Sequence, residues 1–213
     1  MGAKVRTCEE IGFASTLLRL DAQIDEASLL KEIAALNENK DVDGILVQLP
    51  LPKHIREASI INAIDPSKDV DGFHPVSIGK LVLGQDTFLP ATPYGILLML
   101  SYYGIDLSGK HCVVVGRSNI VGTPMSILLS RNNAYGNATV TLTHSKTKDL
   151  KAHCLQADVI IAAIGIPFFL KADMVKDGVI VIDVGITRVP SDKTKSGFKL
   201  LGDVNYKEVA PKA

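Results

Sequence analysis

The sequence predicts an α/β protein built on a doubly wound parallel sheet, and two observations support this. Short apolar segments alternate with helical patterns through the second half of the chain. One of these segments runs directly into a glycine that opens the next helix. Such alternation places parallel strands in one sheet, with helices on both of its faces.

The most informative stretch is His111–Met125. Four apolar residues follow His111 and lead into Gly116, and an apolar helical pattern follows Pro124. A parallel strand that is buried on both faces is a continuous apolar run, and the helix after it offers unpaired N–H groups and a positive dipole end to an anion. We interpret the turn as a phosphate site. Alternatively, Gly116 and Gly122 simply permit tight packing of one strand–helix unit.

This turn differs from the usual dinucleotide fingerprint. Gly116 and Gly122 are present, but Arg117 stands where a second glycine would let a pyrophosphate approach closely.

The remaining elements of the second half follow from periodicity and turn residues. Pro93 is suited to the first position of a helix that runs to Gly104, with Thr92 as its N-cap. The pattern after it predicts strand 112–115, helix 121–130, strand 138–143, helix 147–155 and strands 157–164, 179–184 and 199–204.

The first half predicts two helices and one strand. The helices cover 25–37 and 55–64, and the strand covers 42–49. Pro50 and Pro52 end this strand, because proline cannot continue a ladder. They hold Gln48 at the carboxyl end of a strand, which is the edge where open α/β sheets bind ligands.

Composition excludes several classes of protein. The chain has 213 residues with 23 basic and 23 acidic side chains, so no net field attracts nucleic acid or a membrane surface. Its three cysteines form no Cys-x-x-Cys pair, which argues against a disulfide framework and against a metal site. No apolar run is long enough to span a bilayer. We therefore expect a cytoplasmic protein.

Five segments in one order connect the chain to a known family. They are Val-Gln-Leu-Pro-Leu-Pro (47–52), Lys-Asp-Val-Asp-Gly-Phe (68–73), Pro-Ala-Thr-Pro (90–93), Gly-Arg-Ser-x-x-Val-Gly-x-Pro (116–124) and Val-Ile-Asp-Val-Gly-Ile (181–186). With these motifs the chain closely resembles the bifunctional methylenetetrahydrofolate dehydrogenase/cyclohydrolase family over essentially its whole length.

The resemblance implies a reaction and an architecture. Members oxidise 5,10-methylenetetrahydrofolate to the 5,10-methenyl form with NADP and hydrolyse that product to 10-formyltetrahydrofolate. They have two α/β domains around a cleft, one of them Rossmann-like, and they form homodimers. By this resemblance residues 1–90 form the folate-binding catalytic domain, without the family's first strand and helix. Residues 91–213 form the NADP-binding domain, without the closing C-terminal segment.

The resemblance also assigns catalytic residues. Lys4 precedes Cys8-Glu-Glu-Ile-Gly12 at the distance of the family's catalytic lysine. Attack of water on the methenyl cation requires loss of a proton, so a positioned base or polarising pair is needed, and Lys4 with Gln48 would supply it. Asp69 would accept hydrogen bonds from the amino-pyrimidine edge of the pterin, which leaves Asp71 a structural role.

On the cofactor side the resemblance favours NADP. Gly116 and Ser118 would face the phosphates, and Arg117 would bind the 2′-phosphate. Ser145 stands where NAD enzymes carry an acidic residue for the ribose, and an acid there would repel a 2′-phosphate. The residues expected to line the nicotinamide and adenosine pockets are Thr92, Val121, Gly165 and Ile186.

Two other functions are also compatible with the sequence. The chain could be a different NADP oxidoreductase with a shared nucleotide domain, such as a shikimate-dehydrogenase-like protein, in which Gln48 and Asp69 have no role. It could also be a catalytically inactive protein or fragment that only binds the nucleotide.

Overall fold

The computed structural model describes residues 2–194 and 196–213. The chain divides into two compact units, residues 1–77 and 78–213, and each is described by itself. Among the described residues, no helix combines the length and the apolar character needed to cross a membrane.

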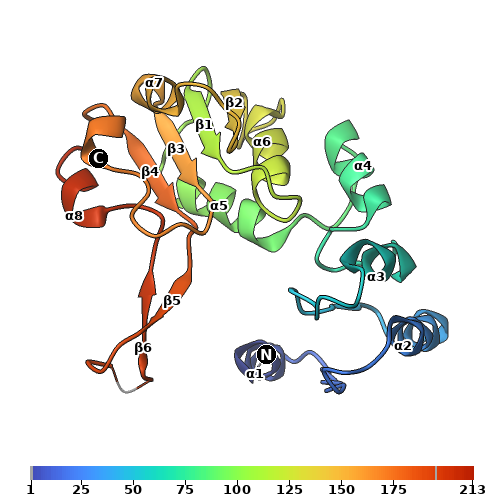
Figure 1. The fold of residues 1–213 in the computed structure, drawn as a ribbon. Coiled ribbons are helices and arrows are strands. Elements are labelled where there is room, and N and C mark those ends of the chain that lie inside the picture. Colours follow the sequence, from blue (N-terminus) through green and yellow to red (C-terminus); the bar gives the residue numbers. More distant parts are fainter. Residues whose placement is uncertain (1, 195) are drawn as a thin grey trace. The chain divides into compact units, whose positions relative to one another are not determined.

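The second unit contains a four-stranded parallel sheet (Figure 1). Its strands are β1 (His111–Val115), β2 (Thr139–Thr143), β3 (Val159–Ala162) and β4 (Ile180–Asp183), in the order β2-β1-β3-β4. The chain passes from β1 to its neighbour β2 and then crosses to β3 on the other side of β1. The carboxyl ends of β1 and β3 therefore form the switch point where such sheets bind ligands.

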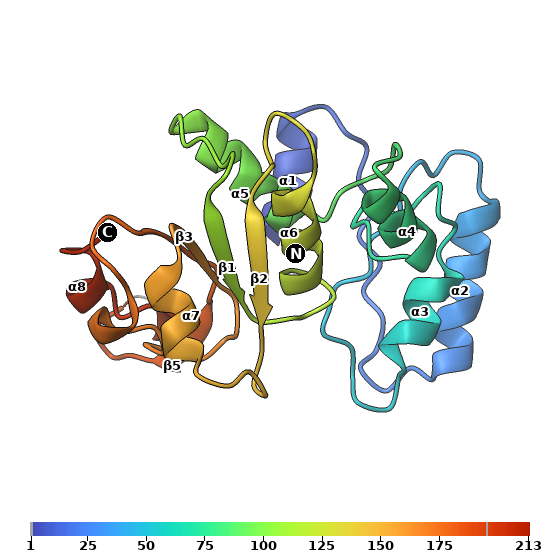
Figure 2. The ribbon, with the colours of Figure 1, turned by 90° about the horizontal axis from the view of Figure 1, so that it is seen from above.

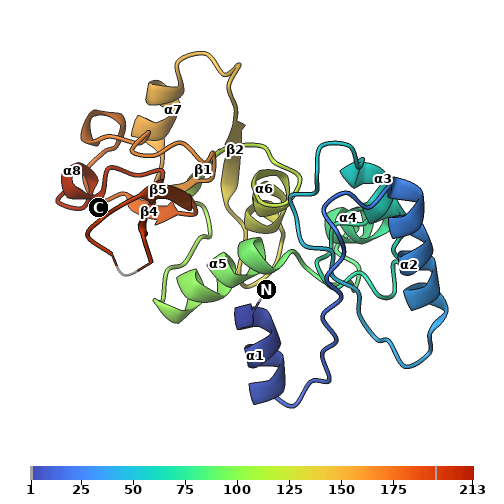
Figure 3. The same ribbon diagram turned by 60° about the horizontal axis from the view of Figure 1, so that its bottom comes forward.

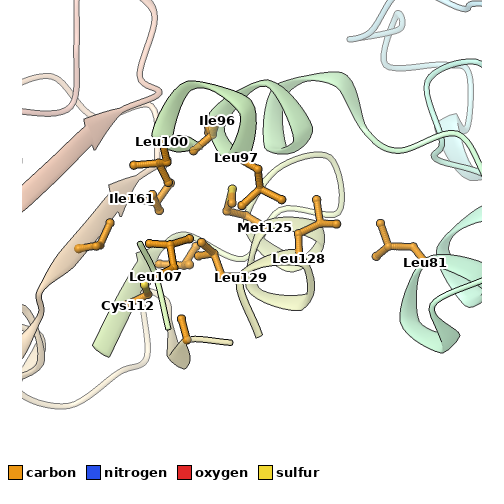
Figure 4. Packing of buried hydrophobic residues seen from close by; sticks show 13 residues of the cluster. Leu81, Ile96, Leu97, Leu100, Leu107, Cys112, Met125, Leu128, Leu129 and Ile161 are labelled. Carbon is orange, nitrogen blue, oxygen red and sulfur yellow. The ribbon is translucent and has the colours of Figure 1, made fainter. Parts of the chain in front are cut away.

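Helices cover both faces of this sheet (Figures 2 and 3). Alternate residues of β1 belong to two separate cores, Cys112 and Val114 to one, Val113 and Val115 to the other. The first core packs against α5 (Ala91–Tyr102) and α6 (Gly122–Ser130), as Figure 4 shows. The second packs against α7 (Leu150–Gln156), the 3₁₀ turn η1 (Ala172–Met174) and α8 (Tyr206–Val209). The predicted parallel sheet with two covered faces is confirmed.

The turn between β1 and α6 is closely packed. Gly116 has φ +117°, and a Cβ built on it would lie 2.2 Å from the Ala163 carbonyl oxygen. A Cβ on Gly122 would lie 2.1 Å from the Gly116 carbonyl oxygen. Both positions therefore require glycine for backbone contact, as the packing alternative anticipated.

A two-stranded antiparallel hairpin extends from the sheet (Figure 1). It consists of β5 (Thr187–Pro190) and β6 (Phe198–Leu201). The sequence predicted one strand at 199–204 here and missed β5, which is short and ends in proline. Phe198 is 51% and Leu200 62% exposed, so two large apolar side chains lie open on one face of the hairpin, opposite Pro190 and Arg188.

Helix α5 begins two residues earlier than predicted, at Ala91. Pro90 is its N-cap, without a side-chain cap hydrogen bond, and Thr92 lies inside the first turn. The expected capping role of Thr92 is therefore wrong. Pro93 is accommodated in the first turn because the N–H that it lacks would have no helical partner there.

The first unit is held together by helices and loops. Its helices are α1 (Gly2–Glu10), α2 (Glu26–Glu38) and α3 (Glu57–Ala63), and α4 (Pro75–Leu83) spans the boundary to the second unit. Two of these match the predicted helices. Their apolar faces pack together in a core of Leu29, Ile33, Ile45, Ile55, Ile60 and Ile64.

The predicted strand 42–49 is not formed as a strand. Ile45 makes a single parallel bridge with Asp69, and the segment is otherwise irregular in the described structure. A strand needs a partner of matching length, and the Asp69 segment turns away at Gly72, which has φ +68°.

Gly122→Ala is expected to destabilise the second unit by about 1–3 kcal/mol, because the new methyl group meets backbone atoms that cannot rotate away. Gly95→Ala in α5 is the matched control. A Cβ there meets nothing within 4 Å, so helix propensity should stabilise by about 0.5–1 kcal/mol. Urea unfolding followed by circular dichroism measures both changes. Equal stability of the two variants would contradict the packing argument.

Candidate functional site

Lys4 and Gln48 lie in the first unit, on different kinds of segment. Lys4 is exposed on α1. Gln48 is exposed in the irregular segment after Ile45, and its amide Nε2 donates to the Leu49 carbonyl oxygen at 2.9 Å. The Leu49–Pro50 peptide bond that follows is cis.

Asp69 is 2% exposed, and both oxygens of its carboxylate accept hydrogen bonds from neighbouring residues of the chain. Oδ2 accepts hydrogen bonds from the His74 N–H at 2.8 Å and the Ser77 hydroxyl at 2.7 Å. Oδ1 accepts a longer one from the Phe73 N–H at 3.3 Å. These bonds tie the 69–74 turn to the start of α4, which gives Asp69 a clear structural use.

Asp71 and Asp69 both line a small, mainly apolar pocket formed within the first unit. Val47 and Leu49, on either side of Gln48, also line this pocket. Burial raises the pKa of Asp71 above its ordinary value, the positive charge of Lys4 opposes that rise, and the negative charge of Asp69 adds to it. Among the described residues, nothing donates a hydrogen bond to Asp71. The positive charge of Lys4 therefore acts on Asp71. In the sequence, Gln48 stands between Val47 and Leu49, which both line the pocket.

In the second unit, the prediction that the N-terminus of α6 offers unpaired N–H groups to an anion is wrong. The Ser118 hydroxyl oxygen accepts from the N–H groups of Val121 and Gly122 at 3.2 and 3.3 Å. The N–H of Thr123 donates to the Ser118 carbonyl oxygen, and Pro124 has no N–H. The first N–H groups of the helix are therefore already paired, because Ser118 folds back to cap them.

The donors that remain at this turn belong to the loop before the helix. In the described structure, the amides of residues 117–120 make no backbone hydrogen bond, and all four residues are exposed. No ion pair of Arg117 is found among the described residues. Loop amides with a free guanidinium are suited to phosphate.

Ser145 is exposed just beyond the carboxyl end of β2, the strand beside β1. The turn is closed by the His144 N–H, which donates to the Thr147 hydroxyl, and by the Lys146 N–H, which donates to His144 Nδ1. Ser145 and Lys146 are the exposed residues of this turn. The sequence between Arg117 and Ser145 contains no aspartate or glutamate. A phosphate would meet no repulsion from the Ser145 position.

The end of β3 carries a feature that the sequence did not reveal. Gly165, with φ +69°, donates its N–H to Asp203 Oδ2 at 3.0 Å, and Ile164 donates to the same oxygen at 2.7 Å. Asp183, the last residue of β4, accepts from the N–H groups of Asp203 and Val204. No local pattern marks Asp203, because its partners lie 38 and 39 residues earlier.

The other predicted cofactor residues differ in how far they are exposed. Val121 is the N-cap of α6, and Thr92 is exposed near the start of α5. Ile186 is 75% exposed between β4 and β5. Gly116 is buried, with its Cα against Ala163, so its contribution to a phosphate site is through the turn that it permits.

The two cysteines of the second unit contribute no reactive thiol. Cys112 and Cys154 are buried, and burial raises the pKa of the first thiol to about 12 and of the second to about 11. Within residues 2–194 and 196–213, no cluster of metal-binding side chains is found.

Comparison with known proteins accounts for both parts of the chain. Residues 1–71 match the catalytic domain of tetrahydrofolate dehydrogenase/cyclohydrolase, and residues 90–213 match its NAD(P)-binding domain. The chain belongs to the tetrahydrofolate dehydrogenase/cyclohydrolase family. Lys4, Gln48 and both aspartates of the 68–73 segment lie in the part that matches the catalytic domain.

Relatives within the tetrahydrofolate dehydrogenase/cyclohydrolase family align along the whole chain. The bifunctional protein FolD of Cytophaga hutchinsonii is 60% identical over 212 residues, which is 100% of this chain and 73% of that protein. The structure of the Campylobacter jejuni bifunctional enzyme FolD has a TM-score of 0.90 and 48% identity, and covers 99% of this chain and 72% of that one.

A third relative was solved with ligands. The Trypanosoma brucei methylenetetrahydrofolate dehydrogenase-cyclohydrolase, complexed with NADP cofactor and inhibitor, has a TM-score of 0.89 and 33% identity. The match covers 97% of this chain and 69% of that chain.

Asp71→Asn should remove a pH-dependent loss of stability. The folded-state pKa of Asp71 is raised above the ordinary 3.8, so its contribution favours the folded state at low pH and is lost as the pH rises through the folded pKa. We therefore expect the variant to gain stability relative to the unmodified chain between pH 4 and pH 7. Urea unfolding at both values measures the gain.

Asp43→Asn serves as the control, because Asp43 is an exposed aspartate of the same unit. A gain of equal size in both variants, or none in Asp71→Asn, would contradict the assignment of the shift to the Asp71 environment.

Proposed function

We propose that this chain oxidises 5,10-methylenetetrahydrofolate to 5,10-methenyltetrahydrofolate with NADP and hydrolyses the product to 10-formyltetrahydrofolate. The observation that carries the proposal is the match of residues 1–71 and 90–213 to the two domains of one bifunctional family. Tetrahydrofolate one-carbon derivatives are then the substrates, and the reactions belong to one-carbon interconversion.

The residues at the β1 turn fit an NADP cofactor. Arg117 presents an exposed cation beside amides without backbone partners, and Ser145 keeps the neighbouring strand end free of negative charge. When bound, NADP accepts the hydride of the dehydrogenase reaction. The chain's contribution to this step is alignment, because the two flanking folate nitrogens stabilise the cationic product and little acid or base assistance is needed.

For the hydrolysis we assign Lys4 and Gln48 as the pair that handles the attacking water. The amine takes the proton or polarises the water, and the amide orients it. Gln48 now donates to the Leu49 carbonyl oxygen, so this role requires the amide to leave that local bond for the substrate. A folate would exchange one neutral hydrogen bond for another, at small net free-energy cost.

We assign the pterin-binding carboxylate to Asp71 in place of Asp69. The oxygens of Asp69 already accept three hydrogen bonds from the 73–77 segment. Asp71 accepts no hydrogen bond among the described residues, and it feels the charge of Lys4. A carboxylate with unsatisfied oxygens is suited to the two adjacent donors of an amino-pyrimidine edge. Asp69 then holds the turn that presents Asp71.

We extend the proposal to domains, assembly and location. Residues 1–90 act as the folate-binding catalytic domain and residues 91–213 as the NADP-binding domain. Two copies form a homodimer, for which the exposed Phe198 and Leu200 of the β5–β6 hairpin are available, and the enzyme works in the cytoplasm. The three unpaired thiols suit a reducing compartment.

Lys4→Met should abolish the cyclohydrolase reaction while leaving NADPH binding unchanged, because the amine is removed and the second unit is untouched. Hydrolysis of methenyltetrahydrofolate, followed by absorbance, measures the loss. Lys31→Met on α2, another exposed lysine of the first unit, is the matched control. Undiminished hydrolysis in Lys4→Met would exclude Lys4 as the base.

Arg117→Ala should weaken NADP binding about tenfold or more and affect NAD little, because a charge-assisted bond to the 2′-phosphate contributes about 1.5–3 kcal/mol. Calorimetric titration with both nucleotides measures the difference. Arg188→Ala, which removes an exposed arginine from the hairpin strand β5, is the control. Equal loss of affinity for both nucleotides would contradict a contact with the 2′-phosphate.

One assay separates this function from its two rivals. Reduction of NADP that depends on methylenetetrahydrofolate supports the proposal. Reduction of NADP with shikimate-like hydroxy acids instead would favour the other oxidoreductase, and NADP binding without turnover would favour a binding protein.

A further inference from the structure

Asp203 is completely buried, yet only one of its oxygens is used. Oδ2 accepts two hydrogen bonds, from the amides of Ile164 at 2.7 Å and Gly165 at 3.0 Å. Oδ1 has no hydrogen-bond partner among the described residues. A buried charge with an unsatisfied oxygen costs free energy, so its presence needs a compensating role.

The hydrogen bond from Ile164 orients a peptide unit that reaches the β1 turn. In a trans peptide the N–H and the preceding C=O point in opposite directions. With the Ile164 N–H directed at Asp203, the Ala163 carbonyl is directed away from it, and this oxygen is the atom that packs against Gly116. The Asp203 carboxylate thus orients the peptide unit after β3, and through the Ala163 carbonyl it contacts the turn after β1.

Asp203 is itself held in place from two sides. Its backbone N–H donates to Asp183 Oδ1 at 2.8 Å, and its carbonyl oxygen accepts from the Leu170 N–H at 2.9 Å. A Cβ built on Gly185 would lie 2.3 Å from Asp203 Oδ1. The free oxygen of the carboxylate therefore lies close against Gly185, where only a glycine leaves room for it.

We propose that Asp203 is a positioning residue for the nucleotide site, which it serves by fixing the Ile164–Gly165 turn at the switch point of the sheet. The proposal rests on the proposed function, in which this turn forms part of the cofactor pocket. Asp203 does not touch the cofactor. It acts through the Ile164 and Gly165 amides and the Ala163 carbonyl, and a neutral acceptor would hold the two amides less firmly.

The test compares Asp203→Asn with Asp158→Asn in the complete chain. Asp158 also accepts a strand-end amide, that of His111 at 2.8 Å, and it pairs with Lys176. Because His111 begins β1, this control lies at the amino end of the strands, away from the switch point. NADPH is the probe, and fluorescence enhancement gives its Kd. Thermal unfolding gives the stability of each variant.

We expect Asp203→Asn to raise the Kd for NADPH about tenfold or more, by analogy with small misplacements around other sites. Asp158→Asn should lower the melting temperature without changing the Kd. Unchanged affinity in Asp203→Asn, or the same loss in both variants, would overturn the proposal.

Two further measurements keep the proposal decidable. A methyl group at position 185 would meet both the carboxylate and the backbone nitrogen of Asp203. Gly185→Ala therefore displaces this residue without removing its carboxylate, and it should also weaken NADPH binding if Asp203→Asn fails to fold. Amide hydrogen exchange at Ile164 and Gly165 should accelerate in Asp203→Asn but not in Asp158→Asn. If the unmodified chain binds no NADPH, the proposed cofactor role fails, and unaltered exchange at these two amides would separately overturn the positioning role.

Discussion

The ends of β1 and β3 approach so closely that no side chain fits between them. The Cα of Gly116 packs against the Ala163 carbonyl, and Gly122 packs against the carbonyl of Gly116 in turn. These contacts bring the start of α6 onto the sheet, so that Met125 and Leu128 reach the core shared with β1. The position of the nucleotide edge, and of the helix that covers it, depends on this backbone contact.

The same contact explains why the sequence predicted this half of the fold well. A strand buried on both faces is recognisable as an apolar run, and a turn that requires two glycines is recognisable by those glycines. Strands β1 to β4 and helices α5, α6 and α7 therefore lie close to their predicted ranges. In each case the decisive information is local.

The failures depend on which groups the fold brings together, and a local pattern does not specify those partners. Segment 42–49 has the composition of a strand but finds only one residue to pair with, Asp69. The difference between Asp69 and Asp71 arises from the turn into α4, where Ser77 and two backbone amides donate to Asp69, while no described residue donates to Asp71. Asp203 was missed because its partners are the amides at the end of a different strand.

The capping of α6 by Ser118 explains why an arginine, Arg117, precedes it in the turn. In the usual dinucleotide fold the helix N–H groups and a close glycine approach hold the pyrophosphate. Here Ser118 pairs the amides of Val121 and Gly122. An anion at this edge must then rely on the exposed loop amides and on a cation, and Arg117 is the residue that supplies the charge. The arginine in place of the second glycine is therefore consistent with the capping of the helix: side-chain charge replaces backbone donors that the fold has already used.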